Sequence, residues 1–163
     1  MSHRTPRWVV ALIVAFAASS LAATAEAKKP IQLALLAPIQ IFSESEQIIG
    51  FRFNLLYGRN ASMHGFDLGL VNHITGEFKG AQAGIVGWSE GQHKGVQYGM
   101  VSLSTGSFTG AQLGGFNYAT RARGLQFGLV NFAERIYGIQ IGLVNIIRQG
   151  GFLPVMILAN GSF

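Results

Sequence analysis

Apolar and polar residues alternate with a period of two along much of the chain after residue 30, a pattern typical of β-strands rather than helices. In residues 138–145 (Gly-Ile-Gln-Ile-Gly-Leu-Val-Asn), the isoleucines and the leucine fall on one face, and the glycines and the glutamine fall on the other. Clusters rich in Gly, Ser and Thr, such as residues 104–107, separate these segments and suit tight turns. The pattern predicts an all-β protein with strands of about ten residues joined by turns of about four.

The alternating segments are copies of one unit, Gly-φ-Gln-φ-Gly-φ-φ-Asn, in which φ is apolar. Copies begin at residues 65, 80, 95, 110, 124 and 138, and a degenerate copy begins at residue 50, so the period is 14 or 15 residues. Such a constant period is the signature of a repeat architecture. The positions that we expect to define the repeat structurally are Gly65, Gly69, Gly80, Gln82, Gly84, Gly95, Gln97, Gly99, Gly110, Gln112, Gly114, Gly124, Gln126, Gly128, Asn131, Gly138, Gln140, Gly142 and Asn145.

The main expectation is an antiparallel meander of about 8–10 strands that closes into a barrel. Strands of this length match the apolar band of an outer-membrane barrel. The apolar face would then meet lipid, and the Gly-Gln-Gly face would fill a narrow interior. Aromatic residues near strand ends, among them Phe78, Trp88 and Phe108, would form interfacial girdles.

The alternative is a β-solenoid with one coil of 14–15 residues per repeat, because stacked units require a near-constant period. In this architecture we expect the apolar face to form the core and the glutamines to stack as a ladder on the outside. Asn72, Asn117, Asn131 and Asn145 would form a second ladder at a bend. The turn clusters, which resemble full reversals of the chain, favour the barrel instead.

The first residues predict a secretory signal. Arg4 and Arg7 precede an apolar run at residues 8–18, and Ala25 and Ala27 offer small residues where a signal peptidase cleaves. We therefore expect residues 1–27 to be removed and residues 28–163 to form a single repetitive β domain. The chain has no cysteine, so we expect neither disulfides nor a lipoprotein anchor.

The amino-acid composition and the distribution of charge limit the classes of partner that we expect. Glycine accounts for 22 of 163 residues, and charged residues are only 12%, about half the usual share. The formal net charge is +5 at pH 7, but the basic residues are scattered along the chain rather than clustered, so we expect no nucleic-acid partner. Outer-membrane lipid or another envelope or surface component is the expected partner, and the sequence leaves a small-molecule ligand unknown.

Few residues suggest site chemistry. Asp67 replaces the central glutamine of its unit, and Arg52 holds the same position one unit earlier, so we predict an interior ion pair between them. His64, His73 and His93 are expected at exposed strand ends, without the further ligands that a metal site needs. We expect no metal, no cofactor and no catalytic group.

The units at residues 124–131 and 138–145 resemble the tandem Gly-Leu-Gln-x-Gly-Leu-Val-Asn repeats of a bacterial surface-repeat family. Residues 31–42 and 151–163 are similar to the entry and closing segments of such proteins. The resemblance implies an exported envelope protein of undefined activity. Gly87 and Ser102 stand where the family usually has asparagine.

Together these features predict an exported structural or surface protein of the bacterial envelope, associated with the outer membrane and without enzymatic activity. The alternative is a soluble periplasmic or secreted β-solenoid that binds a protein or glycan partner along its glutamine ladder.

Overall fold

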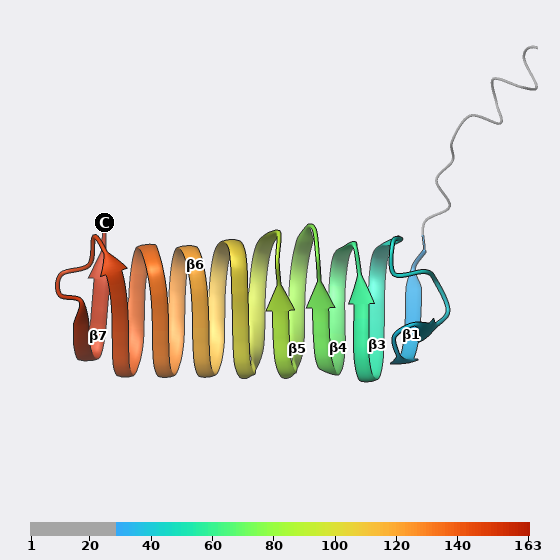
Figure 1. Ribbon diagram of the computed structural model, residues 1–163, viewed down its shortest axis with the longest axis horizontal. Coiled ribbons are helices and arrows are strands. Elements are labelled where there is room, and N and C mark those ends of the chain that lie inside the picture. Colours follow the sequence, from blue (N-terminus) through green and yellow to red (C-terminus); the bar gives the residue numbers. More distant parts are fainter. Residues whose placement is uncertain (1–28) are drawn as a thin grey trace, which may run out of the picture.

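The computed structural model describes residues 29–163, and this part of the chain winds into a β-solenoid (Figure 1). One sheet joins all of its strands in the order β2-β1-β3-β4-β5-β6-β7. The strands are β1 (Ile31–Leu36), β2 (Ile39–Gln40), β3 (Gln47–Asn60), β4 (Ser62–Ile74), β5 (Phe78–Ser89), β6 (Gln92–Gln149) and β7 (Val155–Ser162). Because β6 spans 58 residues and each repeat only 14 or 15, this one strand passes through successive coils.

The register shows that each repeat is one coil. Strands β3, β4, β5 and β6 pair in parallel, and Gly50, Gly65, Gly80 and Gly95 are consecutive partners. The barrel prediction is therefore wrong, and the alternative of a solenoid with 14–15-residue coils is confirmed. Antiparallel hairpins and parallel coils share the same period of two, and the turn clusters bend the chain around each coil instead of reversing it.

The two ends of the solenoid are covered by antiparallel pairs. At the first end, β2 pairs with β1, as in Ala34 opposite Gln40. At the other end, β7 pairs with the last coil of β6, as in Gly138 opposite Ser162 and Ile141 opposite Ala159. These segments cover the open strand edges that a stack of parallel coils would otherwise present.

The faces of the coil are the reverse of those expected for a solenoid. The glutamine column is buried, with Gln97 and Gln126 fully inaccessible, whereas Phe127 is 54% exposed and Leu129 is 60% exposed. The prediction of an apolar core beneath an outer glutamine ladder is therefore wrong. The assignment of faces that we made for a barrel, with glutamine inside and apolar residues outside, describes the solenoid correctly.

Glutamine is tolerated inside because the register satisfies its side-chain amide. The Nε2 atom of each glutamine donates to Oε1 of the glutamine one coil earlier, at 2.7–3.0 Å, from Gln140 back to Gln82. Several amides also cross the coil, as when Gln126 Nε2 donates to the Phe132 carbonyl at 3.2 Å. Buried polar groups that are fully paired avoid the desolvation cost of an unpaired amide.

The predicted asparagine ladder is present at the bend, and its donors point the opposite way. Asn117 Nδ2 donates to Oδ1 of Asn131, which donates to Asn145, both at 2.8 Å. The two ladders thus align their amide dipoles in opposite directions along the stack. Gly87 and Ser102 interrupt the asparagine column in the middle coils, where no asparagine amide is available.

An apolar core fills the remaining side of the coil. Its columns of buried residues come from outside the Gly-φ-Gln-φ-Gly segment: Ile48, Met63, Phe78 and Phe108 in one, and Ile74, Ala119, Ala133 and Ile147 in the other. Phe78 and Phe108 are therefore core residues, and their prediction as interfacial girdles is wrong. The interior is polar on one side and apolar on the other.

Glycine at the first repeat position is required by the backbone. Gly124 has φ +128°, and a Cβ built there would lie 2.1 Å from the carbonyl oxygen of Gly110 in the preceding coil. The same conformation recurs at Gly138, with φ +144°. An L side chain would be strained there and would push adjacent coils apart.

Candidate interaction surface

The outward side of the repeat is an uninterrupted apolar face. We define the apolar face by the second, fourth and sixth residues of each unit, which point away from the buried glutamine. Its members are Phe51, Phe53, Leu55, Phe66, Leu68, Leu70, Ala81, Ala83, Ile85, Val96, Tyr98, Met100, Ala111, Leu113, Gly115, Leu125, Phe127, Leu129, Ile139, Ile141 and Leu143. None of these residues is charged, and the most exposed of them are Phe66, Tyr98 and Met100. A continuous patch of this extent differs from the singly scattered exposed apolar residues of an ordinary protein surface.

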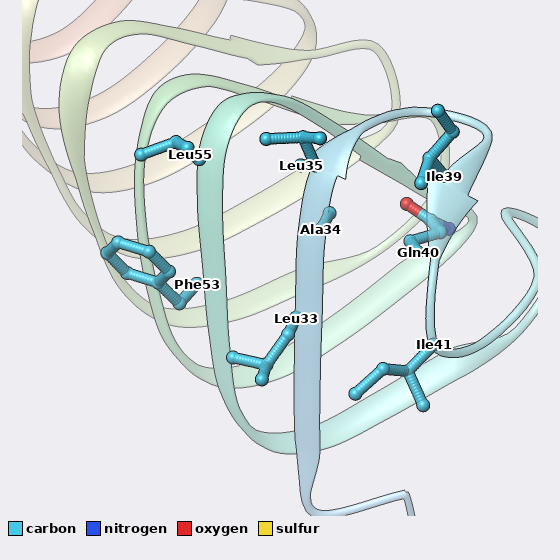
Figure 2. A pocket seen from close by; sticks show the side chains of 8 residues that line it. All are labelled: Leu33, Ala34, Leu35, Ile39, Gln40, Ile41, Phe53 and Leu55. Carbon is cyan, nitrogen blue, oxygen red and sulfur yellow. The ribbon is translucent and has the colours of Figure 1, made fainter.

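The first end of the apolar face is hollowed into a groove (Figure 2). Side chains from β1, from the segment around β2 and from β3 line it, including Leu33, Ile39, Ile41 and Phe53, and its volume is about 500 Å³. Gln40 is its one polar side chain. The groove belongs to the same surface, because Leu33 lies beside Phe53 in the parallel register of β1 and β3.

Basic residues follow one edge of the apolar face. Lys79, Lys94 and Arg123 each precede the first glycine of a unit, and all three are exposed. His64, Lys79 and Lys94 are consecutive partners in the register, so they form a row across adjacent coils. We call this row, together with Arg123, the basic edge. Glu77 lies beside its beginning, where Lys79 Nζ is 2.8 Å from Glu77 Oε1, and the hydrogen bond from Lys79 lowers the pKa of this carboxyl group.

Two further arginines, Arg121 and Arg135, lie near Arg123 of the basic edge toward the second end of the solenoid. Arg121, Arg123 and Arg135 line a shallow groove of about 380 Å³ together with hydroxyl-bearing side chains, among them Thr109. The Arg123 guanidinium lies 5.5 Å from the centre of the Tyr137 ring. Guanidinium groups and hydroxyls gathered in one groove suit an anion that accepts several hydrogen bonds.

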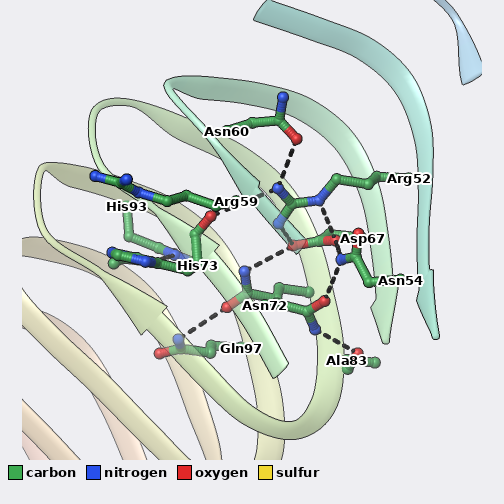
Figure 3. Close-up of polar contacts among 12 residues, drawn as sticks. Arg52, Asn54, Arg59, Asn60, Asp67, Asn72, His73, Ala83, His93 and Gln97 are labelled. Atoms are coloured by element: carbon green, nitrogen blue, oxygen red, sulfur yellow. Dashed lines mark hydrogen bonds and ion pairs between the residues drawn. The ribbon is translucent and has the colours of Figure 1, made fainter. Parts of the chain in front are cut away.

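The residues predicted to pair in the interior are brought together (Figure 3). Arg52 and Asp67 are fully buried and form a bidentate pair, with Nε–Oδ1 at 2.7 Å and Nη2–Oδ2 at 2.5 Å. Asn60 accepts from Arg52 Nη1 at 3.0 Å, and Asn54 and Gln82 donate to Asp67 at 3.2 and 2.8 Å. The pair therefore begins the glutamine ladder and lies away from the surface.

Two histidines differ from the expectation of exposed strand ends, because the inward bend of each coil buries them. His73 contacts the Tyr57 hydroxyl and Glu90 at 2.7 and 2.9 Å and stacks on Trp88. His93 stacks between Phe78 and Phe108, and burial lowers its pKa to about 3. Residues 29–163 contain no group of three or more His, Cys, Asp or Glu side chains that could hold a metal.

The basic edge could not be recognised in the sequence. Its residues lie 15 or more positions apart and therefore look scattered, although the coil brings them into one row. The signal that would have found it is their constant place, directly before the first glycine of the unit. The predicted repeat glycines, glutamines and asparagines lie in the stacked columns, as scaffold beneath the surface.

Comparison with known proteins gives no further identification: no family model, curated protein or solved structure matches this chain. Within residues 29–163, no helix is long and apolar enough to cross a membrane. The predicted signal peptide, residues 1–27, lies outside the described residues.

Proposed function

We propose that this protein is an exported, non-catalytic structural protein of the bacterial envelope that acts by binding an envelope component through its apolar face. The observation that carries the proposal is the absence of charge from every outward position of the Gly-φ-Gln-φ-Gly segment, coil after coil. Exposing so much apolar surface to water is unfavourable, so a covered state is favoured.

The buried interior limits where a partner can bind. The glutamine ladder is buried and cannot contact a partner. The alternative therefore names the wrong binding surface. If the protein is a soluble solenoid, its apolar face is the surface through which it would bind a partner. The buried glutamine and asparagine amides bond one coil to the next, which supports a structural role for the interior.

Fractionation after export tests the proposal. The full chain is expressed in a Gram-negative host beside a Phe127→Asp/Leu129→Asp variant and a matched Ser45→Asp/Thr105→Asp variant, whose substitutions are exposed but lie outside the apolar face and the basic edge. We expect the parent and the matched variant to sediment with envelope membranes and the Phe127/Leu129 variant to be released with the periplasm. Equal distribution of all three proteins would contradict the proposal.

A further inference from the structure

We propose that the component covering the apolar face is a lipid bilayer with anionic headgroups. In this arrangement the solenoid lies flat on the membrane, its apolar face enters the acyl region of one leaflet, and its basic edge contacts headgroup phosphates. This inference rests on the proposed function and names the partner of the same surface.

The first argument is the chemistry of the apolar face. It presents phenylalanine, leucine, isoleucine and methionine from β3 to the last coil of β6, and the Tyr98 hydroxyl is the one polar side-chain group in it. A specific protein interface carries about one hydrogen bond per 100–200 Å² of buried area, far more than one hydroxyl supplies. A surface that is uniformly apolar over its whole length instead matches a fluid apolar phase, as in proteins that lie in the membrane interface.

The second argument is charge complementarity at the boundary of the face. Lys79 lies only two residues before Ala81 of the apolar face, and Lys94 and Arg123 hold the same relation to Val96 and Leu125. Long basic side chains at this depth keep their charge at the headgroups while their methylene groups lie against apolar surface. Each such residue near an anionic surface adds to binding in a way that salt screens.

The third argument is the groove formed by Arg121, Arg123 and Arg135 at the same edge. Arg148 pairs with Glu134 at 3.2 Å, so this carboxylate is engaged by a residue outside the groove. Arginine forks bind phosphate oxygens bidentately. A lipid phosphate in this groove would have its acyl chains directed toward the neighbouring apolar face.

Vesicle flotation tests the inference with the purified exported protein. Vesicles of phosphatidylcholine alone and of phosphatidylcholine with one quarter phosphatidylglycerol are compared at low and high salt. We expect binding to the anionic vesicles to be at least about tenfold tighter, and 0.5 M salt to remove most of this advantage. Equal binding to both vesicle types would overturn the role of the basic edge.

Variants separate the two parts of the surface. Phe127→Asp/Leu129→Asp is expected to abolish flotation on either vesicle, whereas Lys79→Gln/Lys94→Gln/Arg123→Gln is expected to bind anionic and neutral vesicles equally. The Ser45→Asp/Thr105→Asp control adds the same charge at exposed positions outside the apolar face, the basic edge and the arginine groove, and should float like the parent. If the control loses binding as fully as the Phe127/Leu129 variant, the change in net charge alone explains the loss. This result would overturn insertion of the apolar face into the bilayer.

Depth measurement gives an independent reading. Trp88 is the single tryptophan after residue 28, and it lies outside the apolar face, stacked on His73. Brominated lipids should leave its fluorescence unchanged and should quench a Tyr98→Trp/Trp88→Phe variant. Lack of quenching at position 98 would contradict insertion.

One result would overturn the inference and leave the proposed function standing. If the parent does not bind vesicles but still sediments with envelope membranes after export, the apolar face binds another envelope component. If it instead forms a dimer in lipid-free solution that Phe127→Asp/Leu129→Asp dissociates, the face binds a second copy of the chain and the proposed function is contradicted as well. Analytical ultracentrifugation of the same samples distinguishes these cases.

Discussion

At the scale of residues, Asp67 explains how a ladder of amides can begin inside a protein. Every glutamine donates toward the first end of the stack, so the ladder needs an acceptor that does not itself require a further acceptor. A carboxylate meets this need, and Arg52 neutralises its charge within the same column. The ion pair therefore neutralises the buried charges and also terminates the glutamine ladder.

Asp67→Asn should destabilise the protein by about 3–5 kcal/mol, because it leaves the Arg52 guanidinium buried without a counter-charge. Urea unfolding followed by circular dichroism measures this change. The surface pair of Glu134 and Arg148 supplies the control, and Glu134→Gln should cost less than about 1 kcal/mol. Arg52→Gln/Asp67→Gln, which extends the ladder by two amides, should recover most of the loss. Failure of this double variant to recover would argue that the carboxylate itself is required.

His93 should make stability depend on pH. Its pKa in the folded protein is lowered to about 3 by burial, whereas the unfolded chain has the ordinary value of about 6.5. The unfolded state therefore binds more protons between these values, and stability, complete above about pH 6.5, should fall by about 1.4 kcal/mol per unit as the pH drops toward 3.

Unfolding at a series of pH values measures this slope against that of a His93→Phe variant. Phenylalanine would continue the stack of Phe78 and Phe108 without a titratable group. The difference in stability between parent and variant should change with pH over this interval. A constant difference would show that His93 does not titrate on unfolding.

At the scale of elements, glycine columns decide how closely the coils approach. At the first and fifth repeat positions, hydrogen replaces a side chain where the backbone of the next coil passes, as at Gly124 and Gly128. This approach allows the same residues to pair in register along the whole length of β6. The outward residues between these glycines are then free to differ from coil to coil.

Gly124→Ala should destabilise the solenoid by at least about 3 kcal/mol, since strain at φ +128° adds to the clash with the Gly110 carbonyl oxygen. Thermal unfolding compares it with Thr109→Ala, an exposed change at the position before the preceding glycine, expected within about 0.5 kcal/mol of the parent. Similar melting temperatures for the two variants would contradict the requirement for glycine.

The repeat period and the division of each unit into two faces could be read from the sequence, because both follow from alternation. Strand direction could not, since the same alternation and the same turn residues suit hairpins and coils. The burial of Gln97 or Gln126 was expected for a barrel and not for a solenoid, because the hydrogen bond between glutamines one coil apart, which makes the buried amide tolerable, is visible only once the coils are stacked. The basic edge also depends on the stacking of coils, so it could be recognised only from the structure.

At the scale of the whole molecule, the solenoid has two ends that differ from its middle. Parallel coils expose unpaired backbone groups at each terminus of the stack, and such edges recruit further strands. Here β2 and β7 close them by antiparallel pairing. The exposed charged residues lie outside the apolar face, which leaves this side of the solenoid uncharged along its length.

Removal of residues 150–163, and with them β7, should cause the protein to form end-to-end assemblies. The last coil would then offer its free edge to another molecule. Thioflavin T fluorescence and sedimentation should both rise relative to the full chain. Adding Ile139→Lys and Ile141→Lys to the truncated protein should suppress assembly, because lysine on an edge strand blocks pairing. Persistence of monomers without β7 would mean that this strand has no protective role.

The in-register column of glycines has a consequence for how such a protein can change over generations. Because the last coils of β6 present to their neighbours the same glutamine and asparagine contacts that they receive, a recombination event that gains or loses one of these repeats leaves both caps and the ladders continuous. Each event would lengthen or shorten the molecule by one strand spacing, about 4.8 Å. Gain or loss of repeats would therefore change the length of the protein in fixed increments without changing its fold.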